Sequence, residues 1–137
     1  RSALILSAAS ILKILLPERQ LNENIYNSFE KMLNALHMNN WIELYIFWEL
    51  SLIKELGYEI DLHNNNKKDS HNNSVIEINM KFLKIPKMIA EKDPRVKEKR
   101  EIKEALNFNR NLLMENFIIP NRLKFPLFRN ILEHYYS

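Results

Sequence analysis

The chain has 137 residues, of which 46% are hydrophobic and 27% are charged, and its formal net charge at pH 7 is +3. This length and this hydrophobic fraction predict one folded domain and exclude an intrinsically disordered chain. Cysteine is absent from the sequence, which excludes disulfides and thiolate metal sites and is typical of a reducing compartment.

Glycine is also scarce: one glycine stands among many leucine, isoleucine, lysine and glutamate residues. Tight turns and sheets usually need more glycine, whereas these other residues favour helices. We therefore expect a mainly all-α fold, a single domain over residues 1–137 built as a bundle of about five to six helices, with one polar loop and a short strand after the central helix. The sequence starts at Arg1 rather than at a methionine, so we interpret it as a fragment of a longer protein.

The first predicted helix covers Ser2–Leu16 and ends at Pro17, whose ring cannot continue the hydrogen-bond ladder. Its apolar run is too short to span a bilayer and is interrupted by Lys13, which favours a core helix over a membrane or signal segment. The second predicted helix starts after an asparagine cap and reaches about Leu36. Connections this short predict antiparallel neighbours in a bundle.

The third predicted helix is expected to lie at the centre of the bundle. It opens at Asn40, with Glu43 as the partner in a capping box, and it ends at Gly57, which supplies a left-handed terminal residue. Trp48 lies at the edge of its broad apolar arc and is expected to be threaded into the bundle. Glu43 is expected on the opposite, wet side of this helix.

Glu49 breaks the apolar pattern of the central helix, because it projects into the middle of the arc. An unpaired carboxylate there would be costly or would stay protonated. One interpretation is a structural carboxylate bonded to backbone N–H groups or to an arginine. The other is a general acid or base, but no partner for that role lies nearby in the sequence. The structural interpretation is the better supported.

Beyond the central helix the sequence predicts non-helical structure. Residues 58–62 look extended, and the polar stretch His63–Ser74 predicts a loop with nothing to bury. Val75–Asn79 alternates between apolar and polar residues and could form a short strand. The apolar residues around Pro86 predict an irregular segment that lies on the bundle.

Two further helices are predicted in the last third of the chain. Asp93 followed by Pro94 is typical of a helix start, and apolar residues recur at helical spacing up to Phe117, although the helix could break near Glu98. The last predicted helix runs from about Pro126 to Tyr135. The side chains that it is expected to turn to the core are Leu127, Phe128, Ile131 and Leu132.

Four segments of the sequence resemble one known family. LLPER (Leu15–Arg19) and WELSLIKELGYEIDL (Trp48–Leu62) are similar to parts of the C-terminal helical region of RecO, a bacterial recombination and repair mediator. IKEALNFNRNLLMENFI (Ile102–Ile118) and RLKFPLFRNIL (Arg122–Leu132) look like that family's final two helices. The resemblance covers essentially the whole chain and depends on the order of the four segments, because no single motif is diagnostic.

The resemblance implies an N-terminal OB-fold domain before Arg1. It also implies a mediator that is not an enzyme, is cytoplasmic and nucleoid-associated, binds single- and double-stranded DNA, and helps to load the recombinase onto coated single strands. The protein partners that it implies are RecR and the acidic C-terminal tail of single-strand binding protein. It implies no cofactor and no membrane.

The sequence departs from the family in one respect. Many members carry four zinc-binding cysteines after the segment that ends here at Leu62, and this chain has no cysteine. Imidazole and carboxylate groups could ligate a metal, but histidines in asparagine-rich loops more often carry no metal, so we expect no metal site. The residues considered for one are Asp61, His63, Asp69 and His71.

Charge divides the chain into two unequal parts. Residues 1–80 contain 7 lysines and arginines against 10 acidic residues, whereas residues 81–129 contain 13 against 6. A basic half predicts an anionic partner, and DNA fits the family resemblance. The alternative is that glutamates interleaved with these cations simply pair with them on a solvated helix face. The residues predicted to contact DNA are Lys81, Lys84, Lys87, Arg100 and Lys103.

A second predicted site would bind an acidic peptide with an apolar end, such as the tail of single-strand binding protein. Such a peptide needs an apolar pocket rimmed by cations, with arginine favoured for holding a carboxylate. The residues predicted to form it are Phe108, Leu112, Arg110, Arg122, Lys124 and Arg129. The alternative, equally supported, is that the apolar members of this group pack the domain.

Nothing in the sequence predicts catalysis. The sole glycine is interpreted as a helix cap, so no glycine-rich phosphate loop exists, and no serine near a histidine forms a recognisable nucleophile. The alternative function left open is a non-enzymatic helical adaptor or regulatory module that does not bind nucleic acid.

Overall fold

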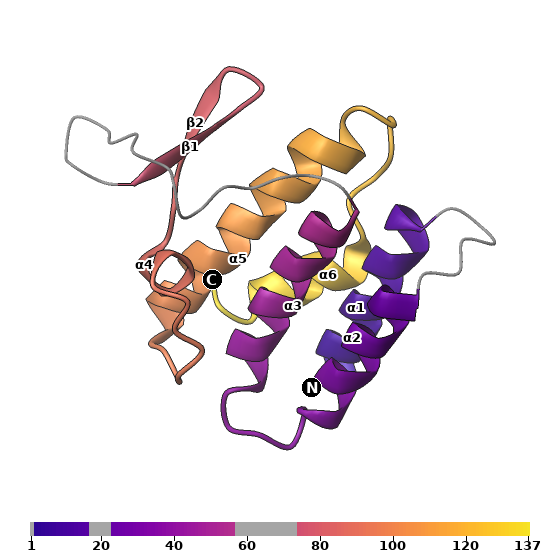
Figure 1. Cartoon of the computed structure of the whole chain (residues 1–137), viewed down its shortest axis with the longest axis vertical. Helices are drawn as coiled ribbons and strands as arrows, with labels where there is room; N and C mark the ends of the chain where they lie inside the picture. The colour runs from indigo at the N-terminus through magenta and orange to yellow at the C-terminus, as the bar shows by residue number, and fades with distance from the viewer. Residues whose placement is uncertain (1, 17–22, 57–73) are drawn as a thin grey trace.

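The computed structural model describes residues 2–16, 23–56 and 74–137, and within them helices dominate, as predicted (Figure 1). The helices and strands, in chain order, are α1 (Ser2–Leu15), α2 (Glu23–Asn34), α3 (Trp41–Glu55), β1 (Val75–Ile78), β2 (Lys81–Lys84), α4 (Lys87–Ala90), α5 (Lys99–Leu113), the π-helical turn η1 (Met114–Ile118) and α6 (Leu127–His134). None of the helices in these ranges is long and apolar enough to cross a membrane.

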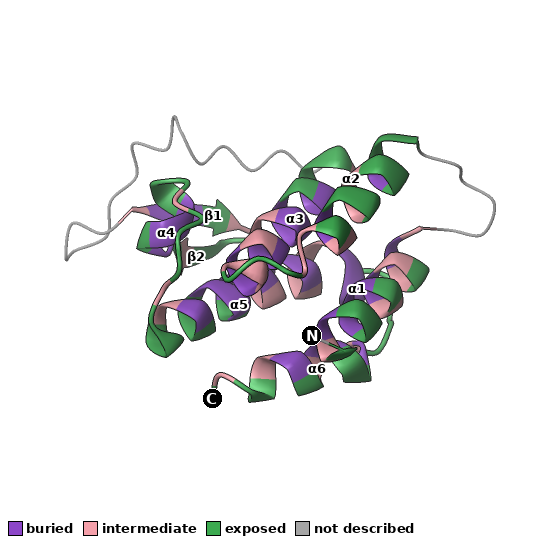
Figure 2. Ribbon diagram, turned by 90° about the horizontal axis from the view of Figure 1, so that it is seen from below, coloured by how far each residue is buried: buried purple, intermediate pink, exposed green. Residues whose placement is uncertain are grey.

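Helix α3 lies in the middle of the bundle, with α2 packed on one side and α5 on the other (Figure 1). The two helices nearest the chain ends, α1 and α6, pack against each other on the lower side of the molecule (Figure 2). The apolar side chains of all these helices form one continuous core. The bundle thus joins segments from both ends of the chain.

Trp48 confirms the central position predicted for its helix. Its side chain is buried, and its ring lies 5.8 Å from that of Phe29 on α2 and 5.7 Å from that of Tyr45, measured between centroids. Tyr45 and Ile46 on the same helix are also fully buried. Burial of large rings is a major stabilising contribution in a domain of this size, so α3 organises the packing of its neighbours.

The predicted capping box at the start of α3 is wrong. Asn40 makes no side-chain hydrogen bond to the helix and donates its amide to the carbonyl of Pro94 at 2.8 Å. Glu43 is 2% exposed rather than on a wet side, and its carboxylate accepts from the backbone N–H of Lys97 at 3.1 Å. Both polar groups bind the segment that precedes α5, because that segment crosses the beginning of α3.

The predicted strand is confirmed as β1, and it pairs with β2 in an antiparallel hairpin that the sequence analysis did not predict. The two turn residues, Asn79 and Met80, both have positive φ (51° and 67°), as a type I′ turn requires. Glu115 of η1 holds this turn, because it accepts from the Asn79 amide at 3.1 Å and from the Lys81 ammonium at 2.7 Å. The hairpin is therefore tied to the end of α5.

Helix α5 begins later than predicted. It opens at Lys99, and the carboxylate of Glu101 reaches back to the N–H of Glu98, the residue before the helix. Asp93 starts no helix, because its carboxylate pairs with the side chains of Arg95 and Lys97. The break expected near Glu98 is thus the true start. At its other end the α-helix gives way to the π-helical turn η1, which was not anticipated.

The face that α6 turns inward also differs from the prediction. Three of the four side chains expected in the core, Leu127, Phe128 and Ile131, are exposed to 67%, 39% and 39%. Only Leu132 is buried, and Arg129 is buried beside it. The helix is rotated so that its arginine, rather than its apolar stripe, points into the bundle.

Several predictions lie outside the described residues. They are the stop at Pro17, the cap at Gly57, the extended stretch 58–62, most of the polar loop, and the candidate ligands Asp61, His63, Asp69 and His71.

Candidate functional site

The five cations predicted to contact DNA are all exposed and lie on the hairpin, on α4 and on the first half of α5. Two of them have an acidic partner: Lys81 pairs with Glu115, and Arg100 lies at 4.0 Å from Glu104. Both of these cations remain largely open to solvent, with side chains exposed to 65% and 82%. Lys84, Lys87 and Lys103 form no ion pair with any described residue.

Two other cations of the basic half form ion pairs that hold the segment before α5. Asp93 binds Arg95 at 2.8 Å and Lys97 at 2.9 Å, and the Lys97 side chain is only 11% exposed. The guanidinium of Arg95 holds the pKa of the Asp93 carboxyl well below its usual range, and Lys97 acts in the same direction. The predicted alternative, pairing with interleaved glutamates on a helix face, is seen among the described residues for Arg100 with Glu104, whereas Arg95 and Lys97 pair with an aspartate that lies before the helix.

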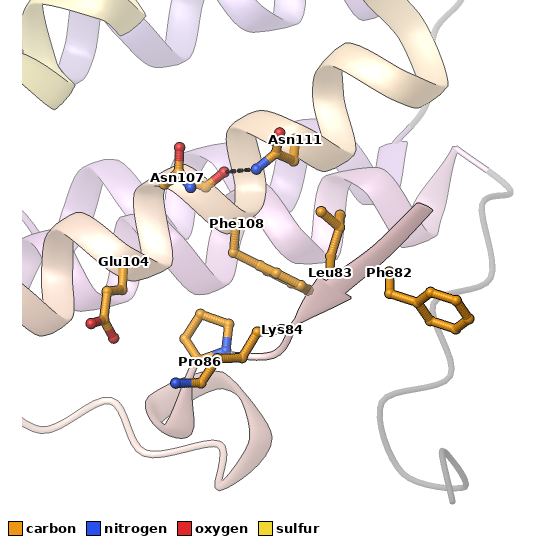
Figure 3. Close-up of a pocket in the computed structure, with 8 residues that line it drawn as sticks. All are labelled: Phe82, Leu83, Lys84, Pro86, Glu104, Asn107, Phe108 and Asn111. Atoms are coloured by element: carbon orange, nitrogen blue, oxygen red, sulfur yellow. Dashed lines mark hydrogen bonds between the residues drawn. The ribbon is translucent and has the colours of Figure 1, made fainter. Parts of the chain in front are cut away.

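A groove of about 290 Å³ separates β2 from the exposed face of α5 (Figure 3). Phe82, Leu83 and Lys84 come from β2, and Pro86 follows directly. The helix contributes four residues that lie within two turns of one another: Glu104, Asn107, Phe108 and Asn111. Lys84, one of the predicted cations, therefore lies beside apolar residues of the groove, such as Phe108, and beside polar ones, such as Asn107.

The residues predicted to bind a peptide do not form a site together. Phe108 and Leu112 are buried, at 3% and 0% exposed, as the alternative interpretation had it. Arg110, on α5, already binds side chains of α6: its guanidinium donates to Asn130 at 2.5 Å and to Glu133 at 3.3 Å. Its guanidinium also lies over the ring of Phe125, at 4.2 Å from the ring centroid.

Arg129 is fully buried, so its prediction as a peptide-binding cation is wrong. Its guanidinium donates to the carboxylate of Glu49 at 2.5 and 3.1 Å and to the carbonyl of Leu106 at 3.0 Å. A cation that is enclosed in this way cannot reach the carboxylate of a partner. Of the predicted peptide-binding cations, Arg122 and Lys124 remain exposed.

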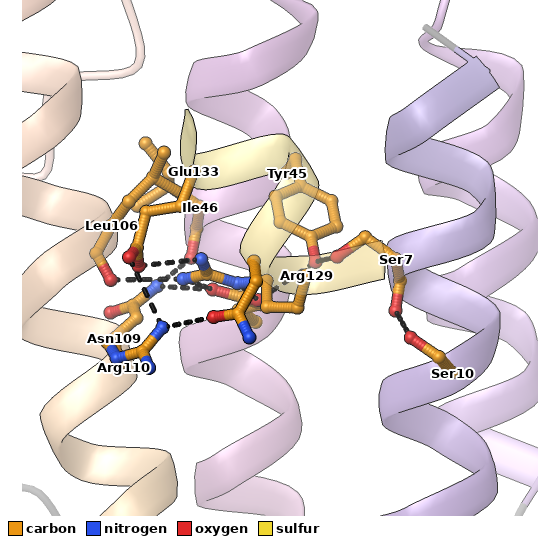
Figure 4. A network of polar contacts seen from close by, with 11 residues as sticks. Ser7, Ser10, Tyr45, Ile46, Leu106, Asn109, Arg110, Arg129 and Glu133 are labelled. Atoms are coloured by element: carbon orange, nitrogen blue, oxygen red, sulfur yellow. Dashed lines mark hydrogen bonds and ion pairs between the residues drawn. The ribbon is translucent and has the colours of Figure 1, made fainter. Parts of the chain in front are cut away.

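Glu49 is confirmed as a structural carboxylate bonded to an arginine. Figure 4 shows that arginine, Arg129, among other members of the network from α1, α3 and α5. Besides Arg129, Glu49 accepts from the hydroxyl of Tyr45 at 2.8 Å and from the amide of Asn109 at 3.1 Å. The network continues through Tyr45 to the hydroxyl of Ser7 on α1, at 2.7 Å. It joins four helices within an apolar core, and the one atom of these bonded side chains left without a partner among the described residues is the carboxamide oxygen of Asn109.

The electrostatics of this network favour a neutral Tyr45 and a charged Arg129. Burial raises the pKa of the Tyr45 hydroxyl well above its ordinary value, and the neighbouring carboxylate of Glu49 raises it further. Burial opposes the charged form of Arg129, but Glu49 outweighs that effect, so the pKa of the guanidinium is raised. Such a network supports the fold rather than proton transfer near neutral pH.

A second groove, of about 380 Å³, runs along the outer face of α3, and the sequence analysis missed it. Its α3 wall carries Leu44, Phe47 and Leu50, which recur every three residues on a side that was expected to be wet. The cations Lys54 and Lys92 lie at the groove and form no ion pair with any described residue. The signal that could have revealed it is the apolar character of α3 all round its circumference. The remaining lining residues are Ser51, Ile89 and Pro94.

The described ranges contain no group of three or more His, Cys, Asp or Glu side chains placed to hold a metal ion.

Comparison with known proteins assigns the family. The family model described as "Recombination protein O C terminal" matches residues 1–76, which is more than half of the chain. A curated relative, "DNA repair protein RecO" of Rhodospirillum centenum, is 31% identical over 61 residues. The match covers 44% of this chain and 24% of the relative, so the chain spans about a quarter of that protein's length. No solved structure matches the chain significantly. This chain belongs to the RecO C-terminal family.

Proposed function

We propose that this chain acts in DNA repair and recombination as a DNA-binding and protein-docking domain, in the cytoplasm at the nucleoid, and not as an enzyme. Membership of the RecO C-terminal family supports the repair role, because a relative carries the name of a DNA repair protein. The non-enzymatic role is supported by the buried polar groups, which the Glu49 network uses to hold helices together. The OB-fold domain that the family resemblance implies before Arg1 is also part of this proposal.

The observation that carries DNA binding is the exposure of five cations on adjacent elements, the hairpin, α4 and the start of α5. Lysine and arginine bind phosphate by charge and release condensed counterions from the DNA. Each phosphate neutralised on duplex DNA adds about −0.9 to the slope of log affinity against log salt, and about −0.7 on a single strand. Contacts of this kind do not read sequence, which suits a mediator that binds single and double strands.

Salt titration tests this proposal. We expect the variant Lys84→Gln/Lys87→Gln/Lys103→Gln to bind single-stranded and duplex DNA more weakly and to lower the salt slope by about 2 to 3 on duplex DNA, in proportion to the phosphates released. A matched control is Lys13→Gln/Lys31→Gln, two exposed lysines on α1 and α2. Fluorescence anisotropy at several salt concentrations gives both quantities. Equal slopes for the variant and the unmodified chain would contradict the proposal.

A second candidate function is docking of the acidic tail of single-strand binding protein in the groove on α3. The specific observation is an apolar groove of about 380 Å³ at which Lys54 and Lys92 lie. An apolar end could enter between Phe47 and Leu50 while acidic residues meet the two cations. Arg122 and Lys124 stay alternative contacts for the tail. We also propose RecR as a partner, on the family resemblance alone.

The charge reversal Lys54→Glu/Lys92→Glu tests the docking site. We expect it to lower the affinity for a labelled acidic peptide with a C-terminal phenylalanine at least tenfold, because two attractive contacts become repulsive. The matched variant Arg122→Glu/Lys124→Glu separates the alternatives. If only this second variant loses affinity, the tail docks beside α6 instead and the groove on α3 is not its site.

A further inference from the structure

We propose that the groove between β2 and α5 receives an unstacked base of single-stranded DNA, with Phe82 as a stacking surface for a neighbouring base. The inference rests on the proposed DNA binding and deepens it, because it names the part of the strand that this surface recognises. It is carried by the shape and lining of the groove and by the cations around it.

The size of the groove suits one base rather than a duplex. Its volume of about 290 Å³ lies near the lower limit of small-molecule pockets, which are typically about 300 to 1,000 Å³. The floor is apolar: the buried ring of Phe108 extends from α5 and lies between Leu83 and Pro86, which come from the other wall (Figure 3). A planar base buries its faces well on such a floor, whereas a base inside a duplex is paired and stacked and cannot enter.

The helix wall presents carboxamides, which can pair with the edge of a base. Asn107 and Asn111 both line the groove, four residues apart on α5. The Asn111 amide donates to the backbone carbonyl of Asn107 at 3.0 Å, which fixes its orientation, and leaves its side-chain oxygen as an acceptor. The Asn107 carboxamide makes no hydrogen bond to a described residue. Side-chain amides offer a donor and an acceptor together, as the edges of bases do.

Cations beside the groove can hold the phosphates on either side of that base. Lys84 is a lining residue, and Lys87 follows three residues later at the start of α4. On α5, Lys103 lies about one turn and Arg100 about two turns before Asn107 on the exposed face. One acid, Glu104, also lines the groove; it can accept from an N–H on the edge of a base, such as N3–H of thymine, but it would repel an acidic peptide. This charge pattern favours a nucleic acid over the peptide as the occupant.

Phe82 supplies an aromatic surface at the edge of the groove, which it also lines. Its side chain is 63% exposed and, as Figure 3 shows, points away from α5, while Leu83 points towards the helix. Lys84, two residues along the strand, lies on the same side of the hairpin as Phe82. Aromatic side chains next to cations bind single strands without strong sequence preference, because every base has a face that can stack. A second base can therefore stack on Phe82 while the first occupies the groove.

Base-dependent binding is the property to measure. The probes are a labelled 20-nucleotide oligothymidine, an abasic strand of the same length and a 20-base-pair duplex, each titrated by fluorescence anisotropy at low salt. The test variant is Phe82→Leu/Asn107→Ala, which leaves the cations in place. The control variant, Tyr26→Leu/Asn27→Ala, changes an exposed aromatic residue and an exposed asparagine on α2.

We expect the unmodified chain to bind oligothymidine about tenfold or more tightly than the abasic strand, since stacking and base contacts act on one probe only. The test variant should lose that preference while keeping its duplex affinity and its salt slope. The control variant should behave as the unmodified chain does. Loss of the preference without loss of duplex binding supports the inference.

Two results would overturn the inference while leaving the proposed DNA binding intact: no preference for oligothymidine in the unmodified chain, or an unchanged preference in the test variant. Absence of binding to all three probes would overturn both proposals. A labelled acidic peptide that loses affinity in the test variant, while oligothymidine does not, would assign the groove to a peptide instead.

Discussion

At the scale of single residues, the ion pair between Arg129 and Glu49 is the main polar contact inside the core of this domain. Both side chains are fully buried, and they lie 80 positions apart in the sequence. Moving two charges from water into a core is costly, and the direct contacts between them offset that cost only while both partners are present. The pair therefore orients α6 against α3 more than it adds net stability.

Replacing one member of the pair should show this dependence. We expect Arg129→Met to lower the free energy of unfolding by about 3 to 5 kcal/mol, because it leaves a buried carboxylate without its cation. The double variant Glu49→Leu/Arg129→Met should recover part of that loss, and the exposed Arg122→Met serves as the control. Urea denaturation followed by tryptophan fluorescence measures all three. A double variant less stable than Arg129→Met would contradict this account.

Glu43 is a buried carboxyl whose charge state should make stability depend on pH. Burial raises its pKa above the ordinary value, although the N–H of Lys97 that donates to it acts in the opposite direction. A carboxyl with a raised pKa in the folded state contributes stability below its unfolded pKa, about 4.3, and loses that contribution as the pH rises through the folded value. The deprotonated form at neutral pH is thus the unfavourable one.

The variant Glu43→Gln carries no charge at any pH and should remove this dependence. We expect it to be more stable than the unmodified chain at pH 7, with a difference that shrinks as the pH falls through the raised pKa of folded Glu43 and levels off below about 4. The matched control is Glu30→Gln on the exposed face of α2. Urea midpoints at pH 3.5 and pH 7 give the comparison. A difference that does not change with pH would show that the charge of Glu43 is not the cause.

Residue patterns in the sequence predicted part of this chemistry. A carboxylate in the middle of the apolar arc was enough to predict that Glu49 has a structural partner. The partner could not be identified, because nothing local links it to position 129. Asn40 and Glu43 show the opposite case: their spacing fits a capping box, but the crossing segment offers the carbonyl of Pro94 and the N–H of Lys97 as competing partners.

At the scale of elements, the hairpin contains strain that a substitution can release. Met80 has a φ of 67° in the turn, a conformation that costs a residue other than glycine about 1 kcal/mol or more. The preferred sequence for a type I′ turn is Asn-Gly. We expect Met80→Gly to raise the free energy of unfolding by about 0.5 to 1 kcal/mol, partly offset by greater freedom of the unfolded chain.

Met80→Ala is the control for this change, because alanine removes the exposed side chain and keeps the strained conformation. Thermal unfolding followed by circular dichroism compares the two. A gain of equal size in both variants would attribute the effect to loss of the exposed methionine rather than to relief of the backbone. The signal for this hairpin was weak in the sequence, since its turn lacks glycine.

The helices α5 and α6 show where elements could be predicted and where their faces could not. Helical spacing located both, but Asp93–Pro94 gave the wrong start for α5, because Asp93 pairs with Arg95 and Lys97 instead of capping a helix. For α6, the apolar stripe was assigned to the core. The buried pair with Glu49 sets the rotation of that helix, and periodicity carries no information on such a tertiary contact.

At the scale of the whole molecule, the packing of α6 on α1 closes the bundle. We expect removal of residues 126–137 to abolish cooperative unfolding, because it deletes Arg129 and Leu132 from the core together. The control Leu127→Ser, on the exposed face of α6, should change stability by less than about 0.5 kcal/mol. Urea denaturation distinguishes a cooperative transition from a gradual one. A sharp transition in the truncated chain would show that α6 is dispensable for the fold.

The ion pair between Glu49 and Arg129 also bears on how this family is delimited. The family match ends at residue 76, so the glutamate lies inside it and its arginine lies outside. An expression clone trimmed to the matched segment would leave the buried carboxylate of Glu49 without its arginine. It would also expose the face of α1 that packs against α6. Gene annotation that follows similarity alone would cut this protein in the middle of its folding unit.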